Sequence, residues 1–349
     1  MRIAVMGTGG VGGYFGARLA QGGHDVAFVA RGRQFEALRV HGLRVESPLG
    51  DVHLSDVEVT EEPAKIDPVD LVLFTVKLWD TVEAAEAIKP LLREQTAVLS
   101  LQNGVVKDDI LGEILGPGHV VGGTCYIAAT IARPGLIRHS GTLQKLVFGE
   151  YDGSESPRVR QFREACADGG IEAEASDRIE ETIWEKFVFL VGASGTTSLA
   201  RSPIGPIREN PRSRAFLRDV MEEVVEVARA QGVPLPAGYA EERLAFTDEV
   251  PAIMTSSMYH DLERGNRLEV AWLSGDVVER GARLGVPTPC NRAIYDILSI
   301  YSEGRLTQSR LSRGARAALL DSGGNGNFDR DDEHVDRGSA QLSEEPGEG

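Results

Sequence analysis

The chain has 349 residues, 42% of them hydrophobic, and a formal net charge of −16 at pH 7. That length is sufficient for two domains, each with its own core. The acidic charge argues against nucleic acid and anionic membranes as partners. A membrane-spanning helix needs about 18 or more consecutive apolar residues, and the sequence contains no such run. We therefore expect a cytoplasmic protein.

The first half of the chain alternates short apolar runs with helical segments. The first run follows Arg2 like the start of a signal peptide, but glycines end it after a few residues, which favours a strand. Buried strands are expected at Arg2–Met6, Asp25–Arg31, Asp70–Val76 and Ala97–Gln102, with a helix over Val11–Gln21. Because such strands are covered by helices on both faces, they predict a Rossmann-type, doubly wound α/β sheet. Later, partly antiparallel strands are expected at Val120–Thr130, Gly135–Ser140, Leu146–Glu150 and Ile171–Ala175.

After Ser176 the apolar residues recur at helical spacing, which predicts a mostly α-helical C-terminal domain. Helices are expected at Ile179–Leu199, Ser213–Gln231, Tyr239–Phe246, Leu268–Leu284 and Asn291–Tyr301. The end of the chain is rich in Gly, Ser, Asp and Glu and is expected to be a disordered acidic tail. The predicted organisation is a Rossmann-type domain over 1–176, a helical domain over 177–312 and the tail over 313–349.

Metal and disulfide chemistry are not indicated. Cys125, Cys166 and Cys290 lie far apart without the spacing of metal ligands, so we expect reduced thiols. The seven histidines are scattered, and we expect no metal.

A glycine motif follows the first strand and opens the first helix. It consists of Gly7, Thr8, Gly9, Gly10, Val11 and Gly12. In this position a GxGxxG sequence is typical of a dinucleotide site, where the helix N-terminus faces the pyrophosphate. The alternative is a glycine-rich turn that binds nothing.

The end of the second strand indicates which dinucleotide is bound. An acidic residue there usually contacts the ribose hydroxyls of NAD, whereas this chain has Arg31 and Arg33. Guanidinium groups suit the 2′-phosphate of NADP(H), although they could also be solvated surface charges. We therefore expect NADP(H) as the cofactor of the domain over 1–176.

Several motifs in order along the chain resemble those of the ketopantoate reductase (2-dehydropantoate 2-reductase) family. They are the GxGxxG, Arg31, Thr75-Val-Lys77, Leu101-Gln-Asn103-Gly104, Trp184-Glu-Lys186, Ser256-Ser-Met-Tyr-His-Asp261 and Leu268-Glu269. The resemblance covers Met1 to about Gly304. It implies a Rossmann domain joined to a helical domain, with the active site in the cleft between them.

The resemblance assigns Lys186 as the general acid. Reduction of a ketone places negative charge on the carbonyl oxygen, and an ammonium can donate the proton. From the residues alone, a lysine that snorkels from a buried helix is an equal alternative. Asn103, after a strand end, would orient substrate and cofactor, although it could be a plain turn residue.

The resemblance also assigns three further residues. Glu269 would contact Lys186 and the cofactor or substrate, and its alternative is a structural ion pair with Arg264 or Arg267. Lys77 would lie near the nicotinamide ribose, or be a surface lysine. Ser257 would bind the substrate carboxylate, or cap a short helix.

The substrate side departs from the family pattern. Two asparagines usually follow the catalytic lysine by one and two helical turns, and a third precedes the serine by three residues. Here these positions are Leu190, Ser194 and Met254. Ser194 is still expected among the substrate-binding residues with Asn103, Lys186 and Ser257, but an apolar pocket discriminates less between substrates.

The leading hypothesis is therefore NADPH-dependent reduction of 2-dehydropantoate to pantoate, a step in pantothenate synthesis. One alternative is a related 2-oxo or 3-hydroxy acid dehydrogenase with a less polar substrate. Another is an NADP-binding regulatory protein without turnover. The expected partner is a small 2-oxo acid, and the apolar faces of the helical domain leave a homodimer open.

Overall fold

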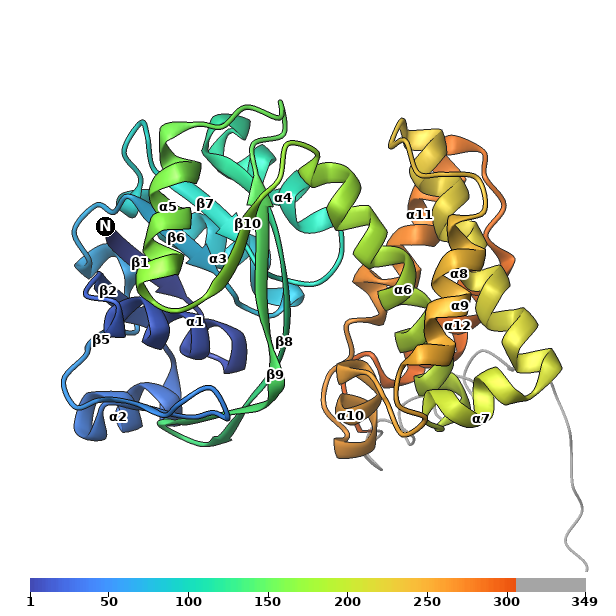
Figure 1. Ribbon diagram of the computed structural model, residues 1–349, viewed down its shortest axis with the longest axis horizontal. Helices are drawn as coiled ribbons and strands as arrows, with labels where there is room; N and C mark the ends of the chain where they lie inside the picture. The colour runs from blue at the N-terminus through green and yellow to red at the C-terminus, as the bar shows by residue number, and fades with distance from the viewer. Residues whose placement is uncertain (306–349) are drawn as a thin grey trace, which may run out of the picture. The chain divides into compact units, whose positions relative to one another are not determined.

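The computed structural model describes residues 1–305 (Figure 1). The N-terminal part of these residues is built on one sheet of ten strands. Their order in the sheet is β4-β3-β9-β8-β7-β6-β1-β2-β5, and β10 also pairs with β9. The strands are β1 (Arg2–Met6), β2 (Asp25–Val29), β3 (Leu43–Glu46), β4 (Val52–Leu54), β5 (Glu58–Thr60), β6 (Leu71–Phe74), β7 (Ala97–Ser100), β8 (Val120–Arg133), β9 (Leu136–Gly149) and β10 (Glu172–Ala175).

The centre of the sheet is parallel and buried on both faces. β7, β6, β1 and β2 are parallel neighbours, and β8 continues the parallel pairing beside β7. Alternate side chains enter different cores: Ile3 and Val5 belong to one apolar cluster, whereas Ala4 and Met6 belong to another. This period of two is the strand geometry that the apolar runs require.

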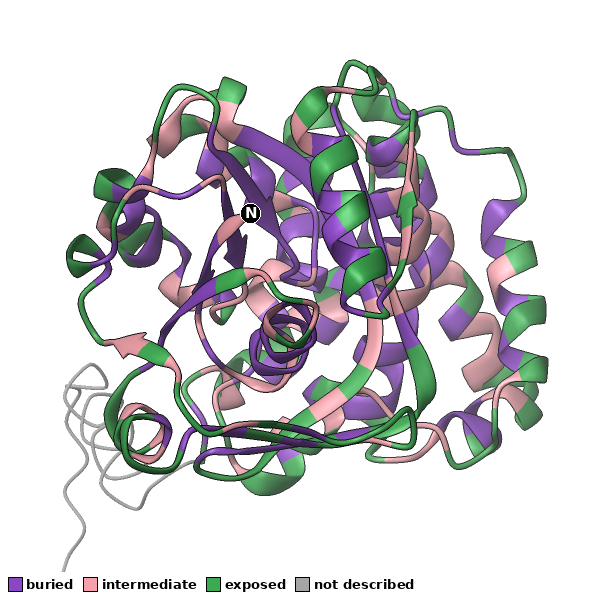
Figure 2. Ribbon diagram, turned by 60° about the vertical axis from the view of Figure 1, so that its left-hand side comes forward, coloured by how far each residue is buried: buried purple, intermediate pink, exposed green. Residues whose placement is uncertain are grey.

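Helices cover both faces of this sheet, and Figure 2 shows the buried strands between helices with exposed outer faces. They are α1 (Gly10–Gln21), α2 (Gly32–His41), α3 (Thr81–Ile88), α4 (Val106–Leu115) and α5 (Pro157–Asp168), with short 3₁₀ turns η1 (Pro63–Lys65), η2 (Leu78–Asp80), η3 (Lys89–Leu91) and η4 (Pro117–His119). Residues of α1 and α5 pack in the cluster that contains Ile3, and residues of α3 and α4 pack in the other. The predicted Rossmann-type fold is confirmed.

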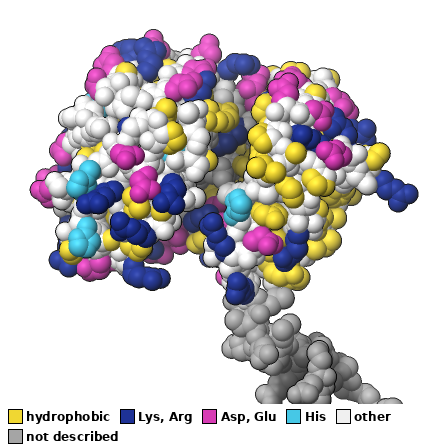
Figure 3. All heavy atoms as spheres, turned by 60° about the horizontal axis from the view of Figure 1, so that its bottom comes forward, with side chains coloured by type: hydrophobic (Ala, Val, Ile, Leu, Met, Phe, Trp, Pro, Cys, Tyr) yellow, Lys and Arg dark blue, Asp and Glu magenta, His cyan; other side chains and the backbone are white. Residues whose placement is uncertain are grey.

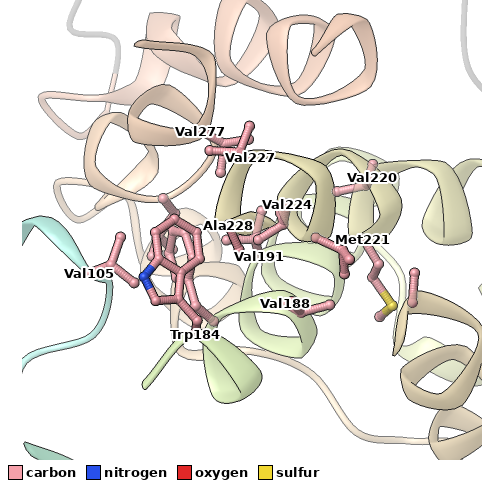
Figure 4. Packing of buried hydrophobic residues seen from close by; sticks show 14 of the residues in the cluster. Val105, Trp184, Val188, Val191, Val220, Met221, Val224, Val227, Ala228 and Val277 are labelled. Atoms are coloured by element: carbon pink, nitrogen blue, oxygen red, sulfur yellow. The ribbon is translucent and has the colours of Figure 1, made fainter. Parts of the chain in front are cut away.

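The helical part begins with α6. Its elements are α6 (Ile179–Ala200), α7 (Ile204–Glu209), α8 (Pro211–Gln231), α9 (Tyr239–Glu249), α10 (Ser257–Arg264), η5 (Val270–Trp272), α11 (Ser274–Leu284), α12 (Pro289–Leu298) and η6 (Ser299–Tyr301). One apolar cluster joins them, and Figure 4 shows Trp184, Val188 and Val191 of α6 packed against residues of α8 and Val277 of α11. The predicted helical C-terminal part is confirmed.

Four predicted elements differ from the structure. The runs expected at Gly135–Ser140 and Leu146–Glu150 form one strand, β9, because β8 pairs with it antiparallel across the polar residues between them. The helix expected over Leu268–Leu284 begins only at Ser274, because Leu273 has non-helical dihedral angles (φ −104°, ψ −98°). The helix expected over Asn291–Tyr301 ends at Leu298 and continues as a 3₁₀ turn.

The change from sheet to helices lies between Ala175, the end of β10, and Ile179, the start of α6. The domain division at residue 176 stays a prediction. The predicted boundary at 312 and the tail over 313–349 lie outside the described residues. Within residues 1–305, none of the helices has the length and apolarity needed to span a membrane.

Candidate active site

The glycine loop lies between the end of β1 and the start of α1, and its three motif glycines have different roles. Gly7 has φ +99°, which favours glycine, and an added Cβ would lie 2.8 Å from the nitrogen of Val76. An added Cβ at Gly12 would overlap the Thr75 hydroxyl, whereas at Gly9 it would meet nothing within 4 Å. The loop therefore packs closely on the sheet at its two ends and leaves space at Gly9, as a pyrophosphate group would need.

The rest of the loop is held by neighbouring strands. The Thr8 hydroxyl donates to the carbonyl of Val29 at 3.0 Å, and the Thr75 hydroxyl donates to the carbonyl of Gly7 at 2.7 Å. Gly10 begins α1 close to the backbone of Ala129 in β8, and Val11 is in the first turn of the helix. The backbone N–H groups at this helix start are thus fixed in position, as an anion site requires.

Arg31 follows β2 and precedes α2, next to the glycine loop. Its side chain is exposed and pairs with Glu83 of α3 at 3.0 Å. Gly32, beside it, donates its backbone N–H to Glu61 at 2.8 Å. An exposed ion pair of this kind is weak, so Arg31 is free to exchange Glu83 for a stronger anion such as a phosphate.

Lys186 lies on α6, where it extends toward the sheet. Its Nζ donates to the carbonyl oxygen of Cys125 at 2.7 Å and lies 3.5 Å from Oδ1 of Asn103. The same ammonium is 5.4 Å from the centre of the Tyr126 ring. Burial lowers the pKa of Lys186 below the ordinary lysine value, and within residues 1–305 no carboxylate forms an ion pair with it. This lysine is therefore tied to the sheet by acceptors rather than left to snorkel into solvent.

Lys77 and Asn103 follow neighbouring parallel strands, β6 and β7, as Gly7 follows β1. Because the carboxyl ends of parallel strands share one edge, these residues lie along the same side of the sheet. The chain positions of Asn103 and Lys186 are 83 residues apart, and the fold brings their polar atoms together at that edge.

Glu269 contacts Lys77 rather than Lys186. Its Oε2 lies 3.7 Å from the Lys77 ammonium, and its Oε1 accepts from the backbone N–H of Leu78 at 3.4 Å. Asp261 pairs with the same lysine at 3.3 Å. Burial opposes the charged form of Lys77, but the two carboxylates outweigh it and raise its pKa. Within residues 1–305, Glu269 forms no hydrogen bond or ion pair with Lys186, Arg264 or Arg267, so the contact expected with Lys186 is replaced by one with Lys77.

Two features of this site have no signal in the sequence. The acceptor that holds Lys186 is the backbone carbonyl of Cys125, and any residue type carries such a carbonyl. Asp261, the second partner of Lys77, lies on α10, and no role was expected for it beyond its place in the motif Ser256-Ser-Met-Tyr-His-Asp261. Its ion pair depends on how the sheet and the helical part meet.

The predicted substrate residues lie along α6 and at the start of α10. Ser194 is two helical turns after Lys186, 1% exposed, and its hydroxyl has no hydrogen-bond partner among the described residues. Leu190 and Met254 are half-buried against the apolar cluster of the helical part. Ser257 is exposed in the first turn of α10, and the residue that caps this helix is Ser256, whose hydroxyl accepts from the N–H of Tyr259.

Two family models match the chain over most of its described length. The model described as ketopantoate reductase PanE/ApbA matches residues 3–153, and the model of the C-terminal part of the same enzyme matches residues 178–302. The chain belongs to the ketopantoate reductase family. The resemblance found in the sequence is thereby confirmed, and with it the enzyme class, an oxidoreductase acting on CH–OH groups.

Individual relatives align with this chain over nearly their whole length. A 2-dehydropantoate 2-reductase of Archaeoglobus fulgidus is 34% identical over 303 residues, which cover 87% of this chain and 98% of the relative. The crystal structure of a PanE/ApbA family ketopantoate reductase from Ralstonia eutropha JMP134 has a TM-score of 0.79 and 35% identity, covering 86% of this chain and 98% of that one. A D-mandelate dehydrogenase solved with NADH and anilino(oxo)acetate also has a TM-score of 0.79, covering 86% and 98% of the two chains, but at 21% identity it shows only the shared fold.

Proposed function

We propose that this ketopantoate reductase family member reduces the keto group of 2-dehydropantoate to give pantoate, with NADPH as the hydride donor. The observation that supports the proposal best is the position of the Lys186 ammonium, which lies against Asn103 at the sheet edge that carries the glycine loop. A binding protein without turnover would not need a cation with a lowered pKa at this place.

Lys186 acts as the general acid in this proposal. Hydride addition to the 2-keto carbon develops negative charge on the carbonyl oxygen, and the Nζ of Lys186 donates a proton to that oxygen. Because burial lowers the pKa of the ammonium, its acidity is closer to that needed near neutral pH than the acidity of an ordinary lysine. The Cys125 carbonyl and Asn103 hold the ammonium in place before the substrate arrives.

The cofactor would supply the hydride, and residues of this chain bind and orient it. The open space at Gly9 and the N–H groups at the start of α1 suit the pyrophosphate. Lys77, held by Glu269 and Asp261, would meet the nicotinamide ribose. Arg31 would give up Glu83 for the 2′-phosphate, which favours NADPH over NADH.

A second candidate is a related dehydrogenase with a less polar 2-oxo acid as substrate. Leu190 and Met254 favour it, because both pack against apolar residues where the family pattern has amides. An amide that pairs with a substrate hydroxyl rejects the analogue without it by about 10⁴–10⁵-fold, whereas an apolar pocket discriminates by only about 10–200-fold. The loss of those amides therefore weakens the case for a hydroxylated substrate more than it weakens the redox chemistry.

The experiment that tests both candidates compares two substrates that differ by one hydroxyl group. 2-Dehydropantoate and 3,3-dimethyl-2-oxobutanoate are each assayed for kcat/KM by NADPH absorbance. Strong preference for 2-dehydropantoate supports the first candidate, and similar or reversed values support the second. Binding of NADPH without turnover of any 2-oxo acid would overturn both and favour a regulatory protein.

A homodimer remains a prediction. Large apolar side chains of the helical part are exposed at Ile253 (84%), Ile297 (53%) and Ile300 (53%). Figure 3 shows hydrophobic side chains gathered on one face of that part. The molar mass measured by light scattering at several concentrations tests for it directly.

A further inference from the structure

The aromatic ring of Tyr126 lies against the ammonium of Lys186. The Nζ of Lys186 lies over this ring, 5.4 Å from its centre, and a cation–π contact extends to about 6 Å. A cation in this position is attracted by the negative face of the ring. The ring is thus a third group that holds the ammonium, besides the Cys125 carbonyl and Asn103.

The strand β8 places this ring next to the carbonyl acceptor. Side chains of successive strand residues point to opposite faces of a sheet. The Cys125 side chain is buried in the apolar cluster of the sheet that contains Ile3, whereas Tyr126 is half-buried against the apolar cluster of the helical part. Lys186 of α6 therefore meets the backbone of Cys125 and the ring of Tyr126 at the same point of the strand.

The charged groups around Lys186 and Tyr126 are paired with other residues. The ionisable side chains nearest the two residues are Cys125 of β8, Lys107 of α4, Glu174 of β10, Glu185 of α6, and Tyr239 and Arg243 of α9. Lys107 pairs with Asp108, Glu174 with Lys145, Glu185 with Arg178, and Arg243 with Glu242. Burial raises the pKa of the Cys125 thiol and of the Tyr126 phenol, so both groups are neutral.

Two further elements that pack on α6 carry acidic residues with partners of their own. Asp261 of α10 pairs with Lys77, and Glu223 of α8 accepts from the backbone N–H groups at the start of α12. A carboxylate beside Lys186 would raise its pKa, as the two carboxylates do for Lys77, and a more strongly held proton makes a weaker acid. An aromatic face attracts the ammonium less strongly and takes no proton from it.

We propose that Tyr126 is a positioning residue for Lys186: the face of its ring holds the ammonium beside Asn103 and favours the protonated form of the lysine. This role rests on the proposed function, because it concerns the proposed general acid. The ring acts rather than the hydroxyl, since the Tyr126 hydroxyl forms no hydrogen bond within residues 1–305.

The pKa of Lys186 can be measured without turnover. The full chain, without cofactor or substrate, is acetylated at trace level with acetic anhydride over a range of pH, and mass spectrometry of the peptide that contains Lys186 follows the reaction of its neutral amine. Tyr126→Leu should move the midpoint of labelling to lower pH by about 0.5–1.5 pH units, because it removes an attraction for the charged form. Tyr126→Phe should keep the parental midpoint. Tyr295→Leu is the matched control, since Tyr295 is also half-buried against the cluster of the helical part.

Fluorination of the ring separates the cation–π contact from packing. A series with Phe at position 126 that carries no, one or three ring fluorines keeps nearly the same shape, while the face of the ring becomes less negative. The midpoint of Lys186 labelling should fall stepwise along this series. The result decides even if Tyr126→Leu does not fold.

An unchanged midpoint along the fluorinated series would overturn the role of the ring. Equal shifts in Tyr126→Leu and Tyr295→Leu would also overturn it, because they would reduce the effect to a loss of packing. Equal shifts in Tyr126→Phe and Tyr126→Leu would assign the effect to the hydroxyl instead.

The same variants distinguish this role from the proposed function. If both hold, the pH at which kcat declines should move in parallel with the midpoint of labelling. A midpoint that moves while the pH profile of kcat stays unchanged would confirm the contact between the ring and the ammonium, and would remove Lys186 from the proton transfer.

Discussion

The ammonium of Lys186 on α6 donates to the backbone carbonyl of Cys125 on β8 at 2.7 Å. This bond joins the helical part to the sheet at the point where the proposed chemistry takes place. It also leaves the ammonium partly desolvated, with an amide and a carbonyl as its acceptors rather than a carboxylate. Because the partner is a backbone group, no substitution at position 125 removes it, so the lysine itself must be changed to test it.

Lys186→Ala should lower kcat by about 10²–10⁴-fold or more, because the general acid and its stabilisation of the oxyanion are lost together. NADPH affinity, measured by fluorescence titration, should stay near the parental value. Lys89→Ala, which removes an exposed lysine paired with Glu86, is the control. Nearly parental turnover would make Lys186 a bystander, and a raised KM with unchanged kcat would limit it to binding.

The pH dependence should follow from the lowered pKa of Lys186. Reduction requires the protonated ammonium, so kcat should be constant at low pH and fall as the pH rises through a value below 10.5, the ordinary lysine pKa. Oxidation of the alcohol requires the neutral amine, so kcat for the oxidation should rise with pH over the same range. Lys186→Arg, whose side chain stays protonated, should lose the alkaline decline. A parental profile that stays flat up to about pH 10.5 would contradict the assignment of the acid.

Arg31→Ala should weaken NADPH binding about 10–100-fold and NADH binding much less, because only NADPH has the 2′-phosphate. Glu83→Gln should strengthen NADPH binding slightly, since it releases Arg31 from its ion pair. Arg39→Ala is the control, because Arg39 pairs with Glu36 on the surface of α2. Equal affinity of the parent for the two cofactors would refute the preference for NADPH.

Glu269→Gln should raise the KM for NADPH several-fold and reduce kcat less than Lys186→Ala does, because Glu269 holds Lys77 rather than the acid. Removal of the carboxylate should also lower the pKa of Lys77, toward the value that burial alone favours. A double-mutant cycle with Lys77→Met measures the coupling. If the effects of the two substitutions on the free energy of NADPH binding are simply additive, the ion pair has no part in cofactor binding.

Leu190→Asn should shift the substrate preference toward 2-dehydropantoate and away from 3,3-dimethyl-2-oxobutanoate, because it restores an amide one helical turn after Lys186. The same change should lower the free energy of unfolding modestly, as Leu190 packs against the apolar cluster. Phe216→Asn, at another partly buried position of that cluster, controls for the loss of stability. An unchanged ratio of kcat/KM for the two substrates would place Leu190 outside the pocket.

The parts of the fold that the sequence predicts well are those with a strong local pattern. The strand around Val72 is apolar throughout, the strand around Val98 is apolar up to Ser100, and both are buried on both faces. Apolar residues recur at helical spacing along α8, and α6 is a long segment rich in apolar and small residues. β3, β4 and β5 were not anticipated, because they have only three or four residues each and mix polar with apolar side chains. α7 was not anticipated either, because it has only six residues and is held by packing against α8 and α6.

In the candidate site, likewise, residues that follow a local sequence pattern could be predicted, whereas contacts set by tertiary packing could not. Gly7, Asn103 and Lys77 follow strands, so the rule for parallel sheets brings them to one edge without further information. The partner of Glu269 could not be obtained in this way, because Lys77 and Lys186 are both plausible cations for it and only tertiary geometry separates them. The spacing of residues along the chain does not specify the angle at which α10 and η5 meet the sheet.

β8 connects the two ends of the proposed reaction site. Its Cys125 carbonyl accepts from Lys186, and its Ala129 backbone lies against Gly10 at the start of α1. These points are four residues apart, about 13 Å along an extended strand, and the pairing of β8 with β9 shifts its register between Ile127 and Ala129. The distance between the proposed proton donor and the proposed phosphate end is thus set by one strand rather than by a loop. A one-residue insertion in β8 between these positions would therefore misalign the nicotinamide end with the acid while leaving both halves of the site intact.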